Sequence, residues 1–217
     1  MVFIPTPYLP TPRGDPLARA LSPPFQRSIT EGSSSEAPLP AAPELGNLRD
    51  RVLRSARVGY VEELLAVIDA LNRHGVEYVL IGGGALNIHG LVRATEDLDL
   101  VVAPTAKNIE SLKSALRSIW SDPEIDRVTA EDLLGDYPAV RYGPPQGDLY
   151  LDILTRLGDL ADFESIEAEV VHVGDVEIRV ATPQSLFRLK RNTVRPIDRA
   201  DAEALREAFE LGEDDAD

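Results

Sequence analysis

Two carboxylates interrupt a segment that is otherwise apolar enough to be buried, and this segment limits what the chain can fold into. Three glycines, Gly82–Gly84, follow a short apolar run, and Asp97 and Asp99 stand inside the next one. In a strand, side chains alternate between two faces, so both aspartates point to one face while Leu98 and Leu100 point to the other. Like charges at such positions repel unless a cation lies between them. The segment therefore predicts a strand with one buried face and a carboxylate pair that needs a positive partner.

Hydrophobic periodicity predicts mixed helices and strands along most of the chain. The last two expected strands surround Gly174 and indicate a β-hairpin. Because hairpin-like pairs alternate with helices, we predict an α/β (α+β) fold in which helices flank a mixed sheet. The expected helices cover residues 48–56, 61–71, 85–91, 109–120, 183–191 and 198–211, and the expected strands cover residues 77–81, 98–103, 139–142, 148–154, 167–173 and 176–181.

The two ends of the chain differ in composition from its centre. Residues 1–45 hold ten of the seventeen prolines. Proline lacks a backbone N–H and has a fixed φ, so we expect a flexible Pro-rich arm that joins no sheet and forms no long helix. This arm is either an inert leader or a docking segment for a partner. Residues 46–211 are expected to form the globular domain, and residues 212–217 a solvated acidic tail.

The composition narrows the function classes. The net charge of −15 excludes a global basic field that would attract nucleic acid or an anionic membrane. The absence of cysteine removes disulfides, cysteine-based zinc sites and thiol nucleophiles. No apolar run approaches the ~20 residues that span a bilayer, and the first residues do not resemble a signal peptide. We expect a soluble, cytoplasmic protein with no membrane partner.

The glycines and aspartates together indicate phosphate chemistry. A strand that runs into Gly82 and Gly83 and then a helix presents backbone N–H groups where a phosphate is favoured. Neighbouring Asp97 and Asp99 would form a hard oxygen site suited to Mg²⁺ or Mn²⁺. Asp152 interrupts a later apolar strand in the same way. If the two strands are neighbours, the three carboxylates could hold two metals for in-line phosphoryl transfer. The alternative is that they are ordinary aspartates on a solvated strand edge.

These residues resemble those of a known family. Ile81-Gly-Gly, separated by thirteen residues from Asp97-Leu-Asp, resembles the signature of the DNA polymerase beta-type nucleotidyltransferases, and Asp152 is similar to their third acidic position. The stretches 93–99 (RATEDLD) and 183–201 (PQSLFRLKRNTVRPIDRAD) are similar to those of the AbiEii-like group. That group includes the nucleotidyltransferase toxins of type IV toxin–antitoxin pairs, among them mycobacterial ones.

The resemblance implies roles for the matching residues near the strands. Gly82 and Gly83 would contact the triphosphate of an NTP substrate. Asp97, Asp99 and Asp152 would bind the metals, and Asp152 would also activate the attacking hydroxyl.

The resemblance implies further roles for charged residues elsewhere. Lys190 would contact phosphate and neutralise developing charge, and Arg93 and Arg195 are candidates for a second phosphate contact. Asp198 and Asp201 match a late acidic motif without an assigned chemistry. Alternatively, they are helix N-terminal aspartates favoured by the helix dipole.

The acceptor and the partners are also implied by resemblance. The expected acceptor is tRNA, and local cations at residues 188–195 and 49–57 are candidates to hold it. The alternatives are a small-molecule acceptor such as an antibiotic, a protein hydroxyl, or a catalytically silent binding module. AbiEii-like toxins carry Ser or Thr where Thr95 stands, and some are silenced when a kinase-like antitoxin phosphorylates it. Thr95 could instead simply enter the strand or cap the preceding turn.

Overall fold

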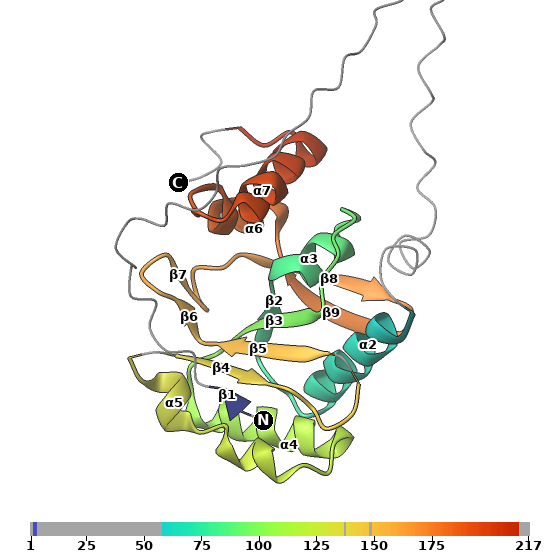
Figure 1. Cartoon of the computed structure of the whole chain (residues 1–217), viewed down its shortest axis with the longest axis vertical. Coiled ribbons are helices and arrows are strands. Elements are labelled where there is room, and N and C mark those ends of the chain that lie inside the picture. The colour runs from blue at the N-terminus through green and yellow to red at the C-terminus, as the bar shows by residue number, and fades with distance from the viewer. Residues whose placement is uncertain (1, 4–57, 137, 148, 213–217) are drawn as a thin grey trace, which may run out of the picture. The chain divides into compact units, whose positions relative to one another are not determined.

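A mixed sheet of seven strands runs through the part of the chain that the computed structural model describes, residues 2–3, 58–136, 138–147 and 149–212 (Figure 1). The strand order is β1-β4-β5-β3-β2-β9-β8; β3 pairs with β5 and β2 with β9 in parallel, and the other pairs are antiparallel. A separate pair, β6 and β7, forms a small hairpin. The strands are β1 (Val2–Phe3), β2 (Tyr78–Leu80), β3 (Asp97–Val102), β4 (Ala139–Tyr142), β5 (Tyr150–Leu154), β6 (Arg156–Leu157), β7 (Ala161–Asp162), β8 (Ala168–Val173) and β9 (Val176–Ala181).

Side-chain caps start several of the helices. Thr105 accepts a hydrogen bond from the Asn108 N–H at the start of α4, and Thr182 does the same for Ser185 at the start of α6. Helices α6 and α7 pack on one another, at the end of the sheet unit opposite α4 and α5 (Figure 1). The helices are α2 (Val58–Arg73), α3 (Gly82–Ile88), α4 (Ala106–Ile119), the 3₁₀ helix η1 (Pro123–Arg127), α5 (Ala130–Leu134), α6 (Pro183–Arg191) and α7 (Pro196–Phe209).

The apolar face of the central strands forms the core. Leu98 and Leu100 on β3 are fully buried, as are their partners Leu151 and Ile153 on β5. Apolar side chains of α2 and α4 belong to the same buried cluster. Because side chains alternate along a strand, the aspartates of β3 lie on the opposite face. Among the described residues, no helix has the length and hydropathy needed to cross a lipid bilayer.

The predicted mixed α/β fold is confirmed. The elements η1, α5 and the β6–β7 hairpin were not among the predicted ones, and two expectations differ from the structure. Helix α3 begins at Gly82 instead of after the glycines, so these residues form its first turn. Val2 and Phe3 pair with β4, although the Pro-rich segment was expected to join no sheet. They can do so because the first proline is Pro5, so both have free backbone N–H groups. The expected helix 48–56, the cations at 49–57, most of the arm and nearly all of the tail lie outside the described residues.

Candidate active site

The glycine turn is packed against the acidic strand too closely for side chains. Gly82 has φ +66°, and a Cβ on it would lie 1.9 Å from Asp99 Oδ2. A Cβ on Gly83 would lie 2.8 Å from the Cβ of Thr95. The Gly83 N–H donates a hydrogen bond to the Asp99 carboxylate. Glycine is therefore required by close approach at both positions, and the turn holds one face of Asp99.

The three predicted carboxylates meet on one face of the sheet. In the parallel pair of β3 and β5, Asp99 stands directly beside Asp152, while Asp97 stands beside Tyr150. Residues two apart on a strand share a face, so Asp97, Asp99 and Asp152 point the same way. The side chains of Asp97 and Asp152 are 36% and 29% exposed. The fold thus brings together residues that are more than fifty positions apart in the sequence.

This gathering makes the carboxylates difficult to ionise together. Burial, then the charges of Asp152 and Asp97, raise the pKa of Asp99 to about 6, against the opposing charge of Lys190. Burial also raises the pKa of Asp152, with Arg141 acting against it and Asp97 adding to it. Such raised carboxyl pKa values are typical of sites that bind a cation or exchange protons.

Arg141 supplies the positive charge among the carboxylates in this structure. It stands opposite Asp152 in the antiparallel pair of β4 and β5. Its Nη2 donates to Asp97 Oδ1 at 2.5 Å, and its Nη1 lies 3.7 Å from Asp152 Oδ2. Its guanidinium also lies over the Tyr150 ring, 4.8 Å from the centroid. Arg141 was not predicted from the sequence. The available signal was its position inside a strand that pairs with the strand of Asp152.

Two hydroxyl groups donate hydrogen bonds to the backbone carbonyl of Asp97. Tyr60 donates to the Asp97 carbonyl at 3.0 Å, and Thr95 donates to the same oxygen at 3.2 Å. Burial, followed by the charge of Asp99, raises the pKa of Tyr60 well above its usual range. Thr95 lies in the irregular segment before β3, which begins at Asp97, so it does not share the strand alternation of Asp97. Its hydroxyl also accepts from the Asp97 N–H at 3.4 Å, so these bonds go to the first residue of β3 and do not correspond to a cap on the preceding turn.

Lys190 is held in a buried ion cluster between α6 and α7. Its Nζ lies 2.9 Å from Asp198 Oδ1 and 2.9 Å from Asp201 Oδ2, and all three side chains are about one-tenth exposed. Arg93 reaches the same cluster, with Nε 3.2 Å from Asp201 Oδ1. Burial acts to raise the pKa of Asp198, but the hydrogen bond and charge of Lys190 outweigh it and lower that pKa. The late acidic motif therefore positions Lys190, whose charge also acts on Asp99.

Arg195 lies at the edge of this cluster. Its Nε is 3.4 Å from Asp198 Oδ2, and its side chain is 71% exposed. The structure therefore collects the predicted residues into two linked groups. The three aspartates and the glycines form the first group, and Lys190, Arg93 and Arg195 surround the acidic pair of α7 in the second.

The donor set suits a divalent metal, although the side chains do not enclose one as they stand. Over the described ranges, no three His, Cys, Asp or Glu side chains are gathered tightly enough to hold a metal ion. Hard carboxylate oxygens are nevertheless the ligands that Mg²⁺ and Mn²⁺ prefer. Burial, followed by the charges of Asp152 and Asp97, raises the pKa of Asp99, and a bound cation would favour its ionised form. Arg141 now occupies the position of a counter-ion, so a metal would have to displace it from Asp97.

A wide cavity of about 700 Å³ opens next to Arg141. Tyr150 and the turn between β4 and β5 form its wall, together with acidic residues near η1. Its lining residues are Asp122, Glu124, Arg141, Gly143, Pro144, Pro145, Gly147, Leu149 and Tyr150.

Solved structures with a similar chain trace include two proteins described as nucleotidyltransferases or nucleotidyltransferase-like and one antibiotic-resistance factor. An antigenic nucleotidyltransferase-like protein from Paracoccidioides brasiliensis is 16% identical, with a TM-score of 0.46 over 69% of this chain and 76% of that one. A Thermotoga maritima protein described as a nucleotidyltransferase is 15% identical, with a TM-score of 0.42 over 71% and 95%. The antibiotic-resistance factor ANT(2'')-Ia is 12% identical, with a TM-score of 0.44 over 73% and 88%. No curated protein matches the sequence.

A sequence match to a known family identifies the family of this chain. Residues 64–200 match the family described as nucleotidyl transferase AbiEii toxin, type IV TA system. This range is more than half of the 217 residues and runs from α2 into α7. It includes the glycine turn, the three aspartates, Arg141 and Lys190. The chain is therefore a nucleotidyltransferase and belongs to the AbiEii family of type IV toxin–antitoxin systems.

Proposed function

We propose that this protein transfers a nucleoside monophosphate from an NTP to tRNA, with Mg²⁺ or Mn²⁺, and acts as the toxin of a toxin–antitoxin pair. The observation that carries the proposal is the placement of Asp97, Asp99 and Asp152 side by side on one sheet face, against a glycine turn. Burial and then their mutual repulsion raise the pKa of Asp99, and a divalent cation would relieve that repulsion.

The chemistry of the chain's own residues supports this reaction. Asp97, Asp99 and Asp152 would hold the metals, which when bound supply charge neutralisation on the phosphates. The acceptor hydroxyl oxygen bonds to the α-phosphorus of the NTP, and the bond from that phosphorus to the pyrophosphate oxygen breaks. Pyrophosphate leaves with the bonding electrons. The hydroxyl proton passes to Asp152, whose raised pKa favours proton acceptance.

Two further features support the binding of substrates. Lys190, fixed by Asp198 and Asp201, places a positive charge close enough to affect Asp99, where it would also act on the NTP phosphates. The cavity beside Arg141 and Tyr150 leaves room for a substrate next to the carboxylates.

The test is a transfer assay with each of the four α-³²P-labelled NTPs, Mg²⁺ or Mn²⁺, and total tRNA. We expect label in tRNA from the wild-type protein and none from Asp97→Ala or Asp99→Ala. Parallel reactions with an aminoglycoside or with protein as the acceptor separate the other acceptor classes. Label found only in those reactions would reject tRNA, and an active Asp97→Ala protein would reject the metal site.

We also propose that a kinase-like antitoxin controls the protein by phosphorylating Thr95. This side chain contacts Gly83 and the backbone of Asp97, so a phosphate there would add roughly −1.5 to −2 charges beside the carboxylates. We expect Thr95→Glu to be inactive. Thr95→Val should keep activity, lose at most about 1 kcal/mol through its turn hydrogen bond, and escape the antitoxin. An antitoxin that still silences Thr95→Val would contradict the proposal; mass spectrometry after co-expression locates the phosphate.

A further inference from the structure

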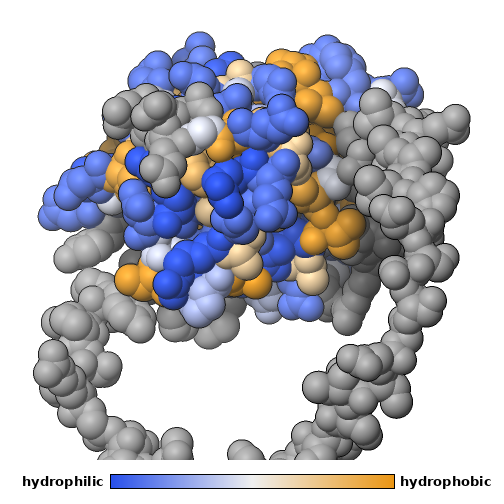
Figure 2. All heavy atoms as spheres, turned by 90° about the horizontal axis from the view of Figure 1, so that it is seen from above, coloured by the Kyte–Doolittle hydropathy of each residue, from blue (hydrophilic) through white to orange (hydrophobic). Residues whose placement is uncertain are grey.

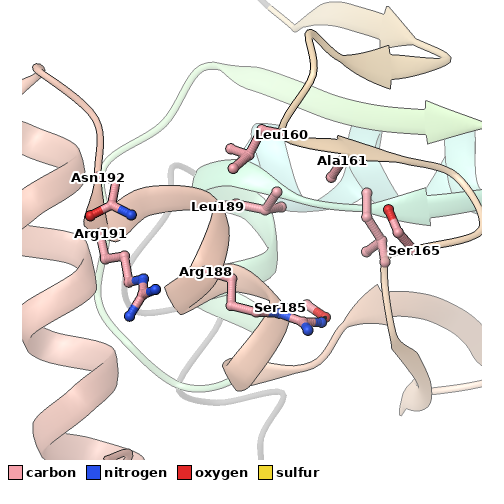
Figure 3. A pocket seen from close by; sticks show the side chains of 9 residues that line it. Leu160, Ala161, Ser165, Ser185, Arg188, Leu189, Arg191 and Asn192 are labelled. Carbon is pink, nitrogen blue, oxygen red and sulfur yellow. The ribbon is translucent and has the colours of Figure 1, made fainter. Parts of the chain in front are cut away.

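The structure divides the basic segment 188–195 into side chains with different surroundings. Lys190 is buried against the aspartates of α7, and Arg195 pairs with Asp198 at the surface. Arg188 and Arg191 instead line a separate pocket between α6 and the β6–β7 hairpin (Figure 3). Successive residues on a helix are about 100° apart, so Arg188 and Lys190 point in widely different directions.

Arg188 and Arg191 differ from the other cations in the described ranges. Neither lies within ion-pair distance of a described carboxylate, yet both are half-buried. Arg188 donates to Ser185 Oγ at 3.2 Å, and Arg191 lies 5.9 Å from the centroid of the Phe187 ring. The other cationic side chains that lack a carboxylate partner there are all exposed to solvent: Lys107, Arg156, Arg179 and Arg199.

A partly desolvated cation without a counter-charge is unfavourable unless an anion completes the site. The hairpin does not supply that anion to Arg188 or Arg191. Its Asp162 carboxylate accepts from the Ser165 N–H at 2.9 Å and makes no ion pair with a described residue. The pocket therefore presents two guanidinium groups together with the polar side chains of Ser165, Ser185 and Asn192.

The volume of the pocket limits the size of the anion that it can bind. Its volume is about 250 Å³, below the roughly 300–1,000 Å³ of sites that enclose drug-sized ligands. A phosphate with its sugar fits this space better than a whole nucleoside triphosphate. Leu160 and Leu189 approach one another from the hairpin and the helix (Figure 3), and they offer an apolar contact beside the cations. Leu160 is 55% exposed although it is apolar.

We propose that this α6 pocket binds a backbone phosphate of the acceptor RNA, with Arg188 and Arg191 as its cationic contacts. The inference rests on the proposed transfer to RNA and adds the place where the acceptor strand is held. The protein carries a net charge of −15, so attraction to RNA has to come from local cations. Seen from above Figure 1, the coloured surface combines hydrophilic residues with apolar patches (Figure 2). In this arrangement, helix α6 presents Lys190 to the aspartates of α7, and it presents Arg188 and Arg191 to the acceptor RNA.

The test measures binding of a fluorescein-labelled tRNA transcript, without NTP, at several salt concentrations. For Arg188→Gln/Arg191→Gln we expect the Kd at low salt to rise roughly tenfold or more, and the slope of log K against log[salt] to fall by about 1–2, as for the loss of two phosphate contacts. The matched control is Arg199→Gln, which removes an exposed arginine that also lacks a carboxylate partner; it should stay within about twofold of wild type. Arg188→Lys/Arg191→Lys keeps the charge and should retain the salt slope.

Further measurements separate this inference from the proposed function. Binding of inorganic tripolyphosphate with Mg²⁺ should be the same in the wild type and the glutamine variant. Loss of tripolyphosphate binding with unchanged tRNA binding would assign the pocket to the NTP and overturn the inference. Equal tRNA affinity and salt slope would overturn it too, while label transferred to RNA by the wild type would leave the proposed function standing. Thermal melting checks folding, and the single variants serve if the double variant is unfolded.

Discussion

At the scale of single residues, the site is governed by charges that the fold forces together. Asp99 is pressed between the glycine turn and Asp152, so its ionised form is disfavoured. Arg141 relieves part of this repulsion by bridging to Asp97. Substitution of Asp99 or Arg141 should therefore change the stability of the metal-free protein, separately from any effect on nucleotide transfer.

Asp99→Asn is expected to raise the melting temperature at pH 7 in EDTA. The folded-state pKa of about 6 lies above the ordinary value of 3.8, so the folded protein holds this proton more tightly than the unfolded chain does. Wild-type stability therefore falls as the pH rises from about 4 to about 6, by on the order of 2–3 kcal/mol. Asparagine does not ionise, so the gain should be greatest at pH 7 and fade toward pH 4. A gain of equal size at every pH would contradict the raised pKa of Asp99.

Arg141→Met is expected to tighten metal binding while it destabilises the metal-free protein. The arginine competes with the cation for Asp97, and its half-exposed ion pair contributes about 1 kcal/mol at most. Its removal should therefore strengthen Mn²⁺ binding by up to about fivefold. Mn²⁺ titration followed by electron paramagnetic resonance measures the affinity, with Arg156→Met as a control at an exposed arginine of β6. Weaker Mn²⁺ binding by Arg141→Met would show that the arginine supports the metal site.

At the scale of elements, the contact between α6 and α7 determines where the basic side chains point. Asp198 and Asp201 stand one turn apart on α7 and both reach Lys190 on α6. The second acid also binds Arg93, which precedes β3. This cluster ties the helix pair to the sheet beside the carboxylates, and it makes Lys190 both a structural and a chemical residue.

Lys190→Ala is expected to abolish transfer and to destabilise the fold by roughly 3–5 kcal/mol, because two buried carboxylates lose their partner. Lys190→Met combined with Asp198→Asn and Asp201→Asn should recover much of the stability but none of the transfer. Arg191→Ala, on the next residue of the helix, should leave stability nearly unchanged. Urea unfolding and the labelled-NTP assay measure the two properties separately. Transfer by the triple variant would mean that Lys190 acts only by holding the helices together.

At the scale of the whole molecule, the start of the chain returns to the sheet. Residues Val2 and Phe3 pair with Tyr142 and Arg141, so β1 extends the sheet beyond the strand that carries the bridging arginine. The pairing involves only two residues at a sheet edge. It joins the backbone of Val2 and Phe3 to the sheet that carries the three aspartates.

Deletion of residues 1–44 is expected to leave the fold and transfer intact but to lower the melting temperature slightly. The loss of the short β1 ladder removes on the order of 1 kcal/mol of hydrogen bonding. Successive N–H groups of a strand point to opposite sides, so only one of the Arg141 and Tyr142 amides donates to β1 and the other faces β5. Hydrogen exchange of that one amide should become faster, while the amides of β3 and β5 stay protected. Unchanged exchange at both Arg141 and Tyr142 would show that β1 contributes nothing to β4 in solution.

The sequence by itself determined the features that depend on residues close to one another along the chain. Alternation in β3 and β5 predicted that each strand exposes its aspartates on one face, because the side-chain period of a strand is fixed by its backbone. The glycines and the spacing to Asp97 identified the family. Helix α6 was predicted with its observed bounds, because proline is favoured at the first position of a helix and Pro183 stands there.

Only the tertiary structure decided which of these features meet. Strand order and register set Asp152 beside Asp99 and bring Arg141 across from Asp152; such pairings depend on long-range packing and leave no local pattern. The docking of α7 likewise turned Lys190 toward two aspartates and left Arg188 and Arg191 beside the hairpin. The sequence showed a single basic segment, because the direction of each side chain is determined only when the helix packs against its neighbours.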